Sequence, residues 1–321
     1  MNIRSSIRDI AAATFGRWPP KLMAALPFVF AAAFGAPQAS AAPIAIGTVM
    51  VSTGSGKVTE FTQTGTMIKQ LDTTTGSTFM TGSMFDSAGN FYVTDFSTLA
   101  VTKFDPSGIL IGPFGSGYTR PESIIHDSAG IVYVGNVSNP ILKFSSTGTL
   151  LKSFVTATGR SDWIELAKDQ CTLYFTGEGL NVGSLNVCTN TAGPNFNKVS
   201  LPSSAFALRL LLAGGMLVAD STAVIRLDAA GNQIKTYTLP GAGVLFSLNL
   251  DPDGTSFWTA DIGGKLFKVN IASGTVVQSW TSSGVPGFTG TFGVSVKGEI
   301  TVIQPPPPPT KCRGFQRPPC S

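Results

Sequence analysis

Two short segments each place an arginine two positions before an acidic residue: Arg120 with Glu122, and Arg160 with Asp162. The two arginines lie 40 positions apart in a chain of which only 12% of the residues are charged. A guanidinium fork can hold a carboxylate or the hydroxyl groups of a sugar. Ion pairing between neighbouring repeat units is the alternative. The candidate ligand-binding set is Arg120, Glu122, Asn136, Arg160, Asp162 and Glu178.

A second set of oxygen-bearing side chains recurs at nearly constant spacing. Its members are Asp95, Asn136, Glu178, Asp220 and Asp261, separated by 41, 42, 42 and 41 positions. If these side chains meet, their oxygens could bind Ca²⁺ or another divalent cation, or a polar ligand. Alternatively, each could hydrogen-bond its own tight loop, as Asp and Asn commonly do. No cofactor is predicted beyond this candidate cation site.

The single histidine restricts the catalytic chemistry of the chain. One His and four Cys argue against zinc sites built on several ligands of either kind. His126 stands where a related segment has Phe85, so we expect it in the core. The sequence has neither a G-x-S-x-G motif nor a phosphate-binding glycine loop. No catalytic residue is therefore predicted.

These residues belong to a repeat. The segments Asp86–Asp95, Asp127–Asn136 and Asp251–Asp261 share an Asp-x-x-Gly turn followed by an aromatic, β-rich run. Each unit of about 40 residues holds four such runs separated by turns, which is typical of one propeller blade. The second unit is expected to contain strands at Phe79–Phe85, Phe91–Asp95, Ala100–Phe104 and Ile109–Phe114. Trp163, Trp258 and Trp280 are expected to pack between blades, with carbohydrate stacking as the alternative.

Both ends of the repeat region are needed to close a ring. The N-terminal part supplies three strands, Gly47–Ser52, Lys57–Phe61 and Met67–Leu71, and lacks an innermost one. Phe292–Val296 would supply that strand, and Glu299–Ile303 is left over. The sequence therefore predicts an all-β, six-bladed propeller of four-stranded antiparallel blades, over residues 42–304. Seven blades is the alternative, with Glu299–Ile303 in a partly built blade.

The D-x-x-G-x-[IVF]-Y-V-x-[DN] pattern resembles the NHL repeat, and residues Phe257–Asp261 are similar to the related YWTD type. The resemblance covers residues 44–304, although the fourth and fifth blades depart from the pattern. It implies the propeller fold and no particular function, since such repeats occur in binding modules, hydrolases and lyases alike. The first hypothesis is an exported, non-enzymatic propeller that binds a small-molecule, carbohydrate or protein partner through its loop face. The alternative is a metal-dependent hydrolase or lactonase of the gluconolactonase type, with Asn136, Glu178 and Asp220 imitating part of its metal set. The E-G-P-x-W start of that family is missing, and the single His argues against propeller lyases.

The N-terminus has the pattern of an export signal. Four basic residues precede the apolar run Leu22–Gly35, and Ala39–Ala41 forms an A-x-A site, so cleavage is expected before Ala42. An uncleaved anchor is the alternative. Cleavage would leave no transmembrane span and a secreted or periplasmic protein, expected to be a monomer. Residues 42–304 would then carry a net charge of −2, which argues against nucleic acid as a partner.

The cysteines favour an oxidising compartment. Cys171 and Cys188 flank a hairpin centred near Gly179–Leu180, which would place them directly opposite each other and within reach of a disulfide. Cys312 and Cys320 would close a small loop in the basic tail. That tail follows five consecutive prolines and makes up the predicted C-terminal region, residues 305–321.

Overall fold

A computed structural model describes residues 42–138 and 140–302 of the chain. The predicted signal peptide, the proline-rich spacer and the predicted Cys312–Cys320 disulfide lie outside these residues. Within them, the structure has no helix long and apolar enough to cross a membrane.

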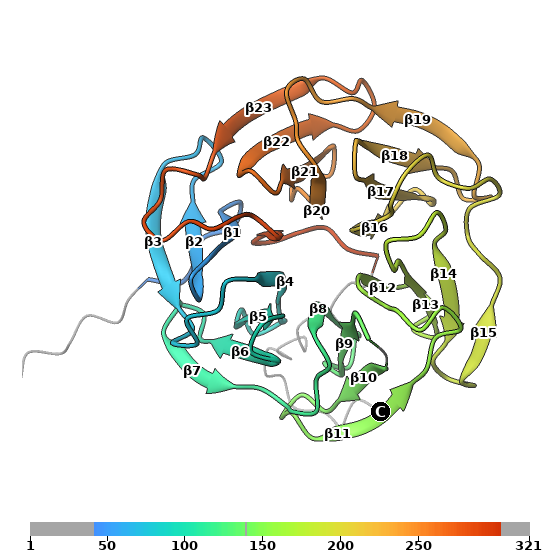
Figure 1. The fold of residues 1–321 in the computed structure, drawn as a ribbon, viewed down its shortest axis with the longest axis horizontal. Helices are drawn as coiled ribbons and strands as arrows, with labels where there is room; N and C mark the ends of the chain where they lie inside the picture. The colour runs from blue at the N-terminus through green and yellow to red at the C-terminus, as the bar shows by residue number, and fades with distance from the viewer. Residues whose placement is uncertain (1–41, 139, 303–321) are drawn as a thin grey trace, which may run out of the picture. The chain divides into compact units, whose positions relative to one another are not determined.

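Six four-stranded antiparallel sheets form a closed ring (Figure 1). From the innermost strand outward, blade 1 contains β24 (Gly293–Val296), β1 (Val49–Gly54), β2 (Lys57–Phe61) and β3 (Met67–Asp72). Blade 2 contains β4 (Met80–Phe85), β5 (Phe91–Asp95), β6 (Ala100–Phe104) and β7 (Leu110–Pro113), and blade 3 contains β8 (Pro121–His126), β9 (Val132–Asn136), β10 (Ile141–Phe144) and β11 (Leu150–Phe154). Blade 4 contains β12 (Ile164–Leu166), β13 (Thr172–Phe175), β14 (Gly183–Asn186) and β15 (Thr191–Gly193). Blade 5 contains β16 (Leu208–Leu210), β17 (Met216–Asp220), β18 (Ala223–Leu227) and β19 (Gln233–Tyr237), and blade 6 contains β20 (Leu245–Leu250), β21 (Ser256–Asp261), β22 (Lys265–Asn270) and β23 (Val276–Thr281).

The Asp-x-x-Gly turns explain why the repeat is so regular. In blade 2, Asp86 Oδ1 accepts hydrogen bonds from the backbone N–H groups of Ala88 at 3.0 Å and Asn90 at 2.9 Å. Gly89 has a φ of +88°, a conformation that favours glycine. The Asp side chain therefore closes the turn between the first two strands of the blade before any contact with a neighbouring blade is needed.

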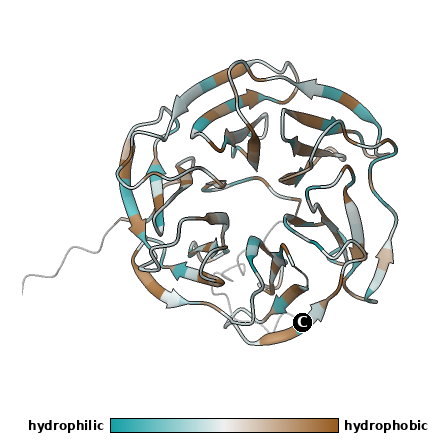
Figure 2. Cartoon of the chain, viewed as in Figure 1, coloured by the Kyte–Doolittle hydropathy of each residue, from teal (hydrophilic) through white to brown (hydrophobic). Residues whose placement is uncertain are grey.

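Each blade buries its faces against its neighbours. Figure 2 shows hydrophobic residues in the strands of all six blades. Innermost strands such as β20 are buried throughout, whereas β23, on the outside, alternates between half-buried and exposed residues. Trp163 and Trp258 are buried, and Trp280 packs on Phe61 with ring centroids 4.7 Å apart, so the tryptophans contribute to packing as expected.

The ring closes as the sequence predicts. β24 pairs antiparallel with β1, with Val49 opposite Val296, so both ends of the repeat region build blade 1. The six-bladed prediction is confirmed and the seven-bladed alternative is wrong. The predicted strand Glu299–Ile303 is also wrong over its described part, because residues 299–302 form no strand. This segment instead crosses the centre of the ring toward β12 and β16 (Figure 1).

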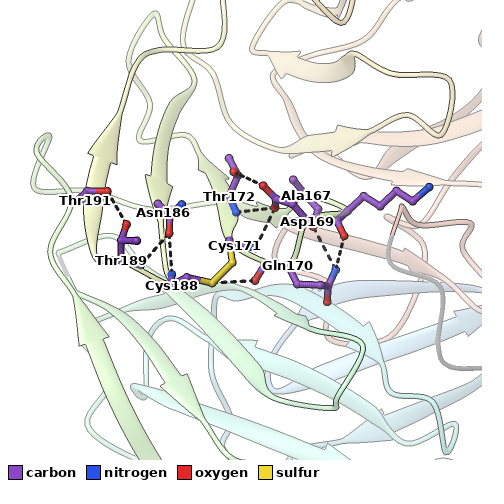
Figure 3. Close-up of a disulfide and its surroundings, with 10 residues drawn as sticks. Ala167, Asp169, Gln170, Cys171, Thr172, Asn186, Cys188, Thr189 and Thr191 are labelled. Atoms are coloured by element: carbon purple, nitrogen blue, oxygen red, sulfur yellow. Dashed lines mark hydrogen bonds between the residues drawn. A yellow bond between two sulfur atoms is a disulfide. The ribbon is translucent and has the colours of Figure 1, made fainter.

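The disulfide between Cys171 and Cys188 is present, with its Cα atoms 5.2 Å apart (Figure 3). Its predicted register is wrong by one residue. The last strand pair is Thr172 with Asn186, and Cys171 accepts a backbone hydrogen bond from Val187 at 2.8 Å. Both cysteines lie just beyond the strand ends, where the backbone still brings them within bonding distance.

Candidate binding site on the loop face

A propeller has two unlike faces. We call the loop face the one that carries the connections from the second to the third strand of each blade and from each outermost strand to the next blade. The turn face carries the Asp-x-x-Gly turns and the turns between the third and fourth strands. Both arginine segments identified in the sequence lead into innermost strands, β8 and β12, and so lie at the loop face.

Four of the five recurring acceptor residues serve their own loops. Asp95, Asn136, Asp220 and Asp261 are all buried. Asp261, for example, accepts backbone hydrogen bonds from Lys265 at 2.9 Å and Gly243 at 2.8 Å. Asp220 accepts two from Ser203, at 3.0 and 3.1 Å, and burial raises its pKa to about 6. These contacts agree with the loop-bracing alternative.

The candidate cation site gains no support from the geometry. In the part of the chain that the structure describes, no group of three or more His, Cys, Asp or Glu side chains could hold a metal ion. Asn136 is also engaged: its Oδ1 accepts from the backbone of Thr119 at 3.0 Å, and its Nδ2 donates to Pro140 at 2.7 Å. The divalent-cation hypothesis therefore stays a prediction.

Glu178 differs from the other acceptors because of a one-residue offset. Asp95 follows Tyr92 by three positions, whereas Glu178 follows Tyr174 by four. Glu178 accordingly lies beyond the end of β13, has a φ of +59°, and exposes 41% of its side chain. It reaches across its loop and forms an ion pair with Arg160 at 2.9 Å.

Arg160 is held by two carboxylates at once. Its Nη2 lies 2.7 Å from Asp162 Oδ2, which also accepts from Nε at 3.2 Å, and the same Nη2 contacts Glu178. Asp162 is buried while Arg160 is about one third exposed. Nε and Nη2 of the guanidinium are therefore already paired within the protein.

Glu122 adds a third carboxylate, and this one is not matched. It lies in a bulge of β8, where the pairing with β9 shifts by one residue between Pro121 and Ser123. Only 4% of Glu122 is exposed, and its Oε2 has no hydrogen-bond partner in the described structure. The corresponding bulge of blade 2 carries Thr81, whose hydroxyl is bonded to Thr94 at 2.8 Å.

The pKa values of Glu122 and Asp162 are both raised. Burial raises the pKa of Glu122 well above its ordinary value, the charges of Asp162 and Glu178 raise it further, and only Arg160 opposes this. Burial also raises the pKa of Asp162 to about 6, against the lowering effect of Arg160. Asp162 Oδ1 is itself buried without a partner in the described structure. We call Glu122, Arg160, Asp162 and Glu178 the loop-face cluster.

Two members of the predicted set lie outside this cluster. Arg120 is exposed, has a φ of +73°, and places its guanidinium carbon 5.7 Å from the ring centre of Phe96 in blade 2. Asn136 is occupied in bracing its loop. The structure thus brings together Glu122, Arg160, Asp162 and Glu178, and leaves Arg120 and Asn136 apart from them.

Sequence reasoning missed a second ionic cluster, on the turn face. Glu165 and Arg209 occupy matching positions in β12 and β16, opposite Tyr174 and Leu217 respectively. Each is a charged residue between two apolar ones in a short innermost strand, which is the signal that could have identified them. With Asn249 and Glu299 they form the turn-face cluster.

In this cluster the donors and acceptors are matched. Arg209 Nε donates to Glu299 Oε1 at 2.8 Å, and Nη1 lies 3.4 Å from Glu165. Glu299 also accepts from Asn249 Nδ2 and from the backbone of Leu250, both at 2.7 Å. These bonds hold the segment after β24 across the channel, which explains why residues 299–302 form no strand. Burial raises the pKa of Glu165 to about 8, with Arg209 opposing.

A cavity of about 470 Å³ adjoins the turn-face cluster, lined by Arg209 and Glu165 among others. His126 is half-buried in its wall, and not in the core as expected. Its Nδ1 lies 2.9 Å from the backbone oxygen of Asp127. The last innermost-strand position of blade 3 faces the channel mouth, which accounts for the difference.

No family model matches the chain, and no curated protein matches it. The chain does match solved structures. A chain of the nidogen/laminin complex is 14% identical, with a TM-score of 0.64 over 78% of this chain and 98% of that one. Virginiamycin B lyase from Staphylococcus aureus is 15% identical, with a TM-score of 0.50 over 67% and 73% of the two chains. The WD40 propeller domain of Doa1 is 12% identical, with a TM-score of 0.58 over 77% and 81%.

At these identities the likeness concerns the fold alone. Enzymatic and non-enzymatic propellers are both present among the similar structures, so the fold is compatible with either. The argument against lyase activity, which rests on the single histidine, is not tested by a likeness of fold. The chain is a six-bladed β-propeller similar to the propeller of the nidogen complex and to the streptogramin-type lyases.

Proposed function

We propose that this chain is an exported, non-enzymatic, NHL-like β-propeller that binds a partner through its loop face. The binding group of that partner is cationic: a lysine or arginine side chain of a protein, or a small amine. The observation that carries the proposal is the pair of buried carboxylate oxygens, on Glu122 and Asp162, that have no hydrogen-bond partner in the described structure.

Leaving such atoms unmatched is costly. A buried polar group without a partner destabilises a protein by about 1–3 kcal/mol, and a charged one by more. Such groups are rare in native proteins, and a water, an ion or a ligand can supply the missing partner. Two unmatched carboxylate oxygens within the loop-face cluster, on Glu122 and Asp162, therefore favour a binding role over a structural one.

The charge of the loop-face cluster decides which class of ligand it favours. The loop-face cluster contains three carboxylates and one guanidinium, and that guanidinium already contacts Asp162 and Glu178. An incoming carboxylate would find Nε and Nη2 of Arg160 already paired, whereas an incoming cation would be attracted by the excess of acidic over basic groups in the cluster. The anion or sugar clamp suggested by the sequence is thus the less favoured reading.

Other features support a binding module in an exported protein. The repeat resembles the NHL type, the N-terminal pattern is that of a signal peptide, and Cys171 and Cys188 form a disulfide. One similar propeller comes from a complex of nidogen with laminin, and so from a protein–protein assembly. We propose a secreted or periplasmic location, and we propose no cofactor.

The test is titration of the purified protein with a tetralysine peptide and with a tetraglutamate peptide, followed by calorimetry at pH 8 and low salt. Tetralysine should bind and tetraglutamate should not. Glu122→Gln should weaken tetralysine binding about tenfold or more, because a hydrogen bond to a charged group contributes about 1.5–3 kcal/mol.

Glu60→Gln is the matched control. Glu60 is also a buried glutamate, and its Oε2 likewise accepts no hydrogen bond in the described structure, but it lies in β2, outside the loop-face cluster, with Lys69 Nζ 3.5 Å away. Glu60→Gln changes the net charge by the same amount as Glu122→Gln but leaves the loop-face cluster intact. Tetralysine binding should therefore be unchanged. Equal losses in the two variants, or no binding by the wild type, would contradict the proposal.

A further inference from the structure

A second pocket lies on the turn face between blades 5 and 6, away from the loop-face cluster. Its volume is about 310 Å³. Most of its lining is aliphatic and comes from the turns of both blades and from the segment after β24. The lining includes Leu211, Leu212, Leu250, Ile271 and Ile300, together with the side chain of Arg226.

Arg226 is the unusual member of this lining. Its Nε is buried and has no hydrogen-bond acceptor in the described structure, and no carboxylate among the described residues pairs with it. The neighbouring acid, Asp251, does not compensate for it, because Asp251 pairs with Lys268 at 2.9 Å. The guanidinium contacts the Tyr237 phenol: burial raises the pKa of that phenol, and Arg226 opposes the rise.

The walls of the pocket are fixed by bonds between the two blades. The Tyr237 hydroxyl donates to the backbone oxygen of Ile271 at 2.6 Å. Lys235 Nζ donates to the backbone oxygen of Ala272, also at 2.6 Å. The turn of blade 6 that lines the pocket is therefore held in place by blade 5, and the pocket exists without a ligand to shape it.

We propose that this pocket binds a small amphipathic carboxylate, of the class of medium-chain fatty acid anions. The aliphatic chain would pack on Leu211, Ile271 and Ile300, and the carboxylate would accept hydrogen bonds from Arg226. Arginine suits this role because its fork matches the two oxygens of a carboxylate. A volume of about 300 Å³ is at the small end of ligand pockets, which fits a chain of moderate length.

The experiment titrates the full-length protein with hexanoate, octanoate and decanoate, and with 1-octanol as the uncharged counterpart. Octanoate should bind well above the octanol level. Affinity should rise about fourfold for each added methylene until the pocket is full. Chemical shift changes of methyl groups should concentrate at Ile271 and Ile300, which locates the ligand.

Variants separate the charge from the apolar contact. Arg226→Gln should weaken octanoate binding about tenfold, and Arg226→Lys, which keeps the charge without the fork, should recover part of the loss. Leu212→Asp, at an exposed position of the lining, should also weaken binding through like-charge repulsion. Lys198→Gln removes an exposed positive charge in the connection between blades 4 and 5 and should change nothing.

Three outcomes would overturn the proposal: equal binding of octanol and octanoate, an Arg226→Gln affinity equal to the wild type, or shift changes away from Ile271 and Ile300. Each variant's unfolding transition is measured alongside. The Leu212→Asp result keeps the test informative if Arg226→Gln fails to fold.

Discussion

The two arginine clusters of this propeller have similar members and different bonding. Each places one guanidinium against two carboxylates: Asp162 and Glu178 around Arg160 on the loop face, and Glu165 and Glu299 around Arg209 on the turn face. On the turn face, both oxygens of Glu299 accept hydrogen bonds. On the loop face, one oxygen of Asp162 and one of the third acid, Glu122, have no hydrogen-bond partner in the described structure.

This difference separates an ionic group that builds the fold from one that is available to a partner. The turn-face cluster ties together segments from blades 4, 5 and 6 and the residues after β24. Removing its central cation, Arg209, should therefore cost stability. The loop-face cluster holds charge that the fold does not neutralise, so removing Glu122 should cost binding and not stability.

The largest effect is expected at Arg209. Arg209→Met fills the space of the side chain but leaves Glu165 and Glu299 buried without a cation. Breaking a buried ion pair by removing one partner costs about 3–5 kcal/mol. Urea unfolding should show a loss of that size. A loss below about 1 kcal/mol would show that the turn-face cluster is not a structural element.

The next effect is a dependence of stability on pH. The pKa of Glu165 is raised to about 8 and that of Asp162 to about 6, so the folded protein keeps protons that the unfolded chain has released. The free energy of unfolding is therefore highest near pH 4.5 on this account. It falls as the pH rises above the ordinary carboxyl pKa values, until about pH 6 for the contribution of Asp162 and until about pH 8 for that of Glu165.

Glu165→Gln tests which cluster produces the upper part of that fall. The variant should make the decline between about pH 6 and 8 shallower, by on the order of 1–3 kcal/mol at about 1.4 kcal/mol per pKa unit. Part of the decline between about pH 4.5 and 6 should persist because Asp162 is unchanged. Superimposable wild-type and Glu165→Gln profiles from urea unfolding would contradict the assignment.

A smaller effect, of opposite sign, is expected at Glu122. Glu122→Gln keeps the shape of the side chain and removes a charge whose ionisation burial disfavours. Stability at pH 8 should rise by about 1 kcal/mol, in the range reported for unsatisfied buried groups. At pH 4.5 the gain should vanish because Glu122 is then protonated in the folded state. A loss of stability at pH 8 would place Glu122 among the structural residues.

The smallest effect is expected at Arg120. Arg120→Ala removes an exposed side chain that lies over Phe96 and contacts no member of the loop-face cluster in the described structure. Its unfolding free energy should change by less than about 0.5 kcal/mol, as for most surface substitutions. Tetralysine binding should be unchanged. A loss of tetralysine binding similar to that of Glu122→Gln would show that Arg120 belongs to the binding site.

Much of the fold could be predicted because its signals are local. The strands Lys57–Phe61, Phe91–Asp95 and Ala100–Phe104 have the predicted bounds, since Asp-x-x-Gly turns and period-2 patterns lie within a few residues of each other. Errors arose where a distant contact intervened. Glu299 was expected in a strand, but Arg209 and Asn249, about 90 and 50 positions earlier, hold it across the channel.

The candidate site was predicted in part. Repeat spacing placed Glu122, Arg160, Asp162 and Glu178 at one face, and the structure brings these four together. The same spacing could not distinguish Arg160 from Arg120, because each stands two positions before an acidic residue in a segment that leads into an innermost strand. One residue inserted after Tyr174 carries Glu178 toward Arg160, and a left-handed backbone at Arg120 accompanies its contact with blade 2.

The sequence by itself determined the four-stranded repeat, the closure of blade 1 by both ends of the repeat region, and the Cys171–Cys188 pair. These depend on turn chemistry and strand periodicity, which short stretches of chain encode. Only the tertiary structure decided which charges meet and which oxygens stay unmatched. The energy of a buried charge depends on every group that surrounds it, and in this propeller those groups come from different blades.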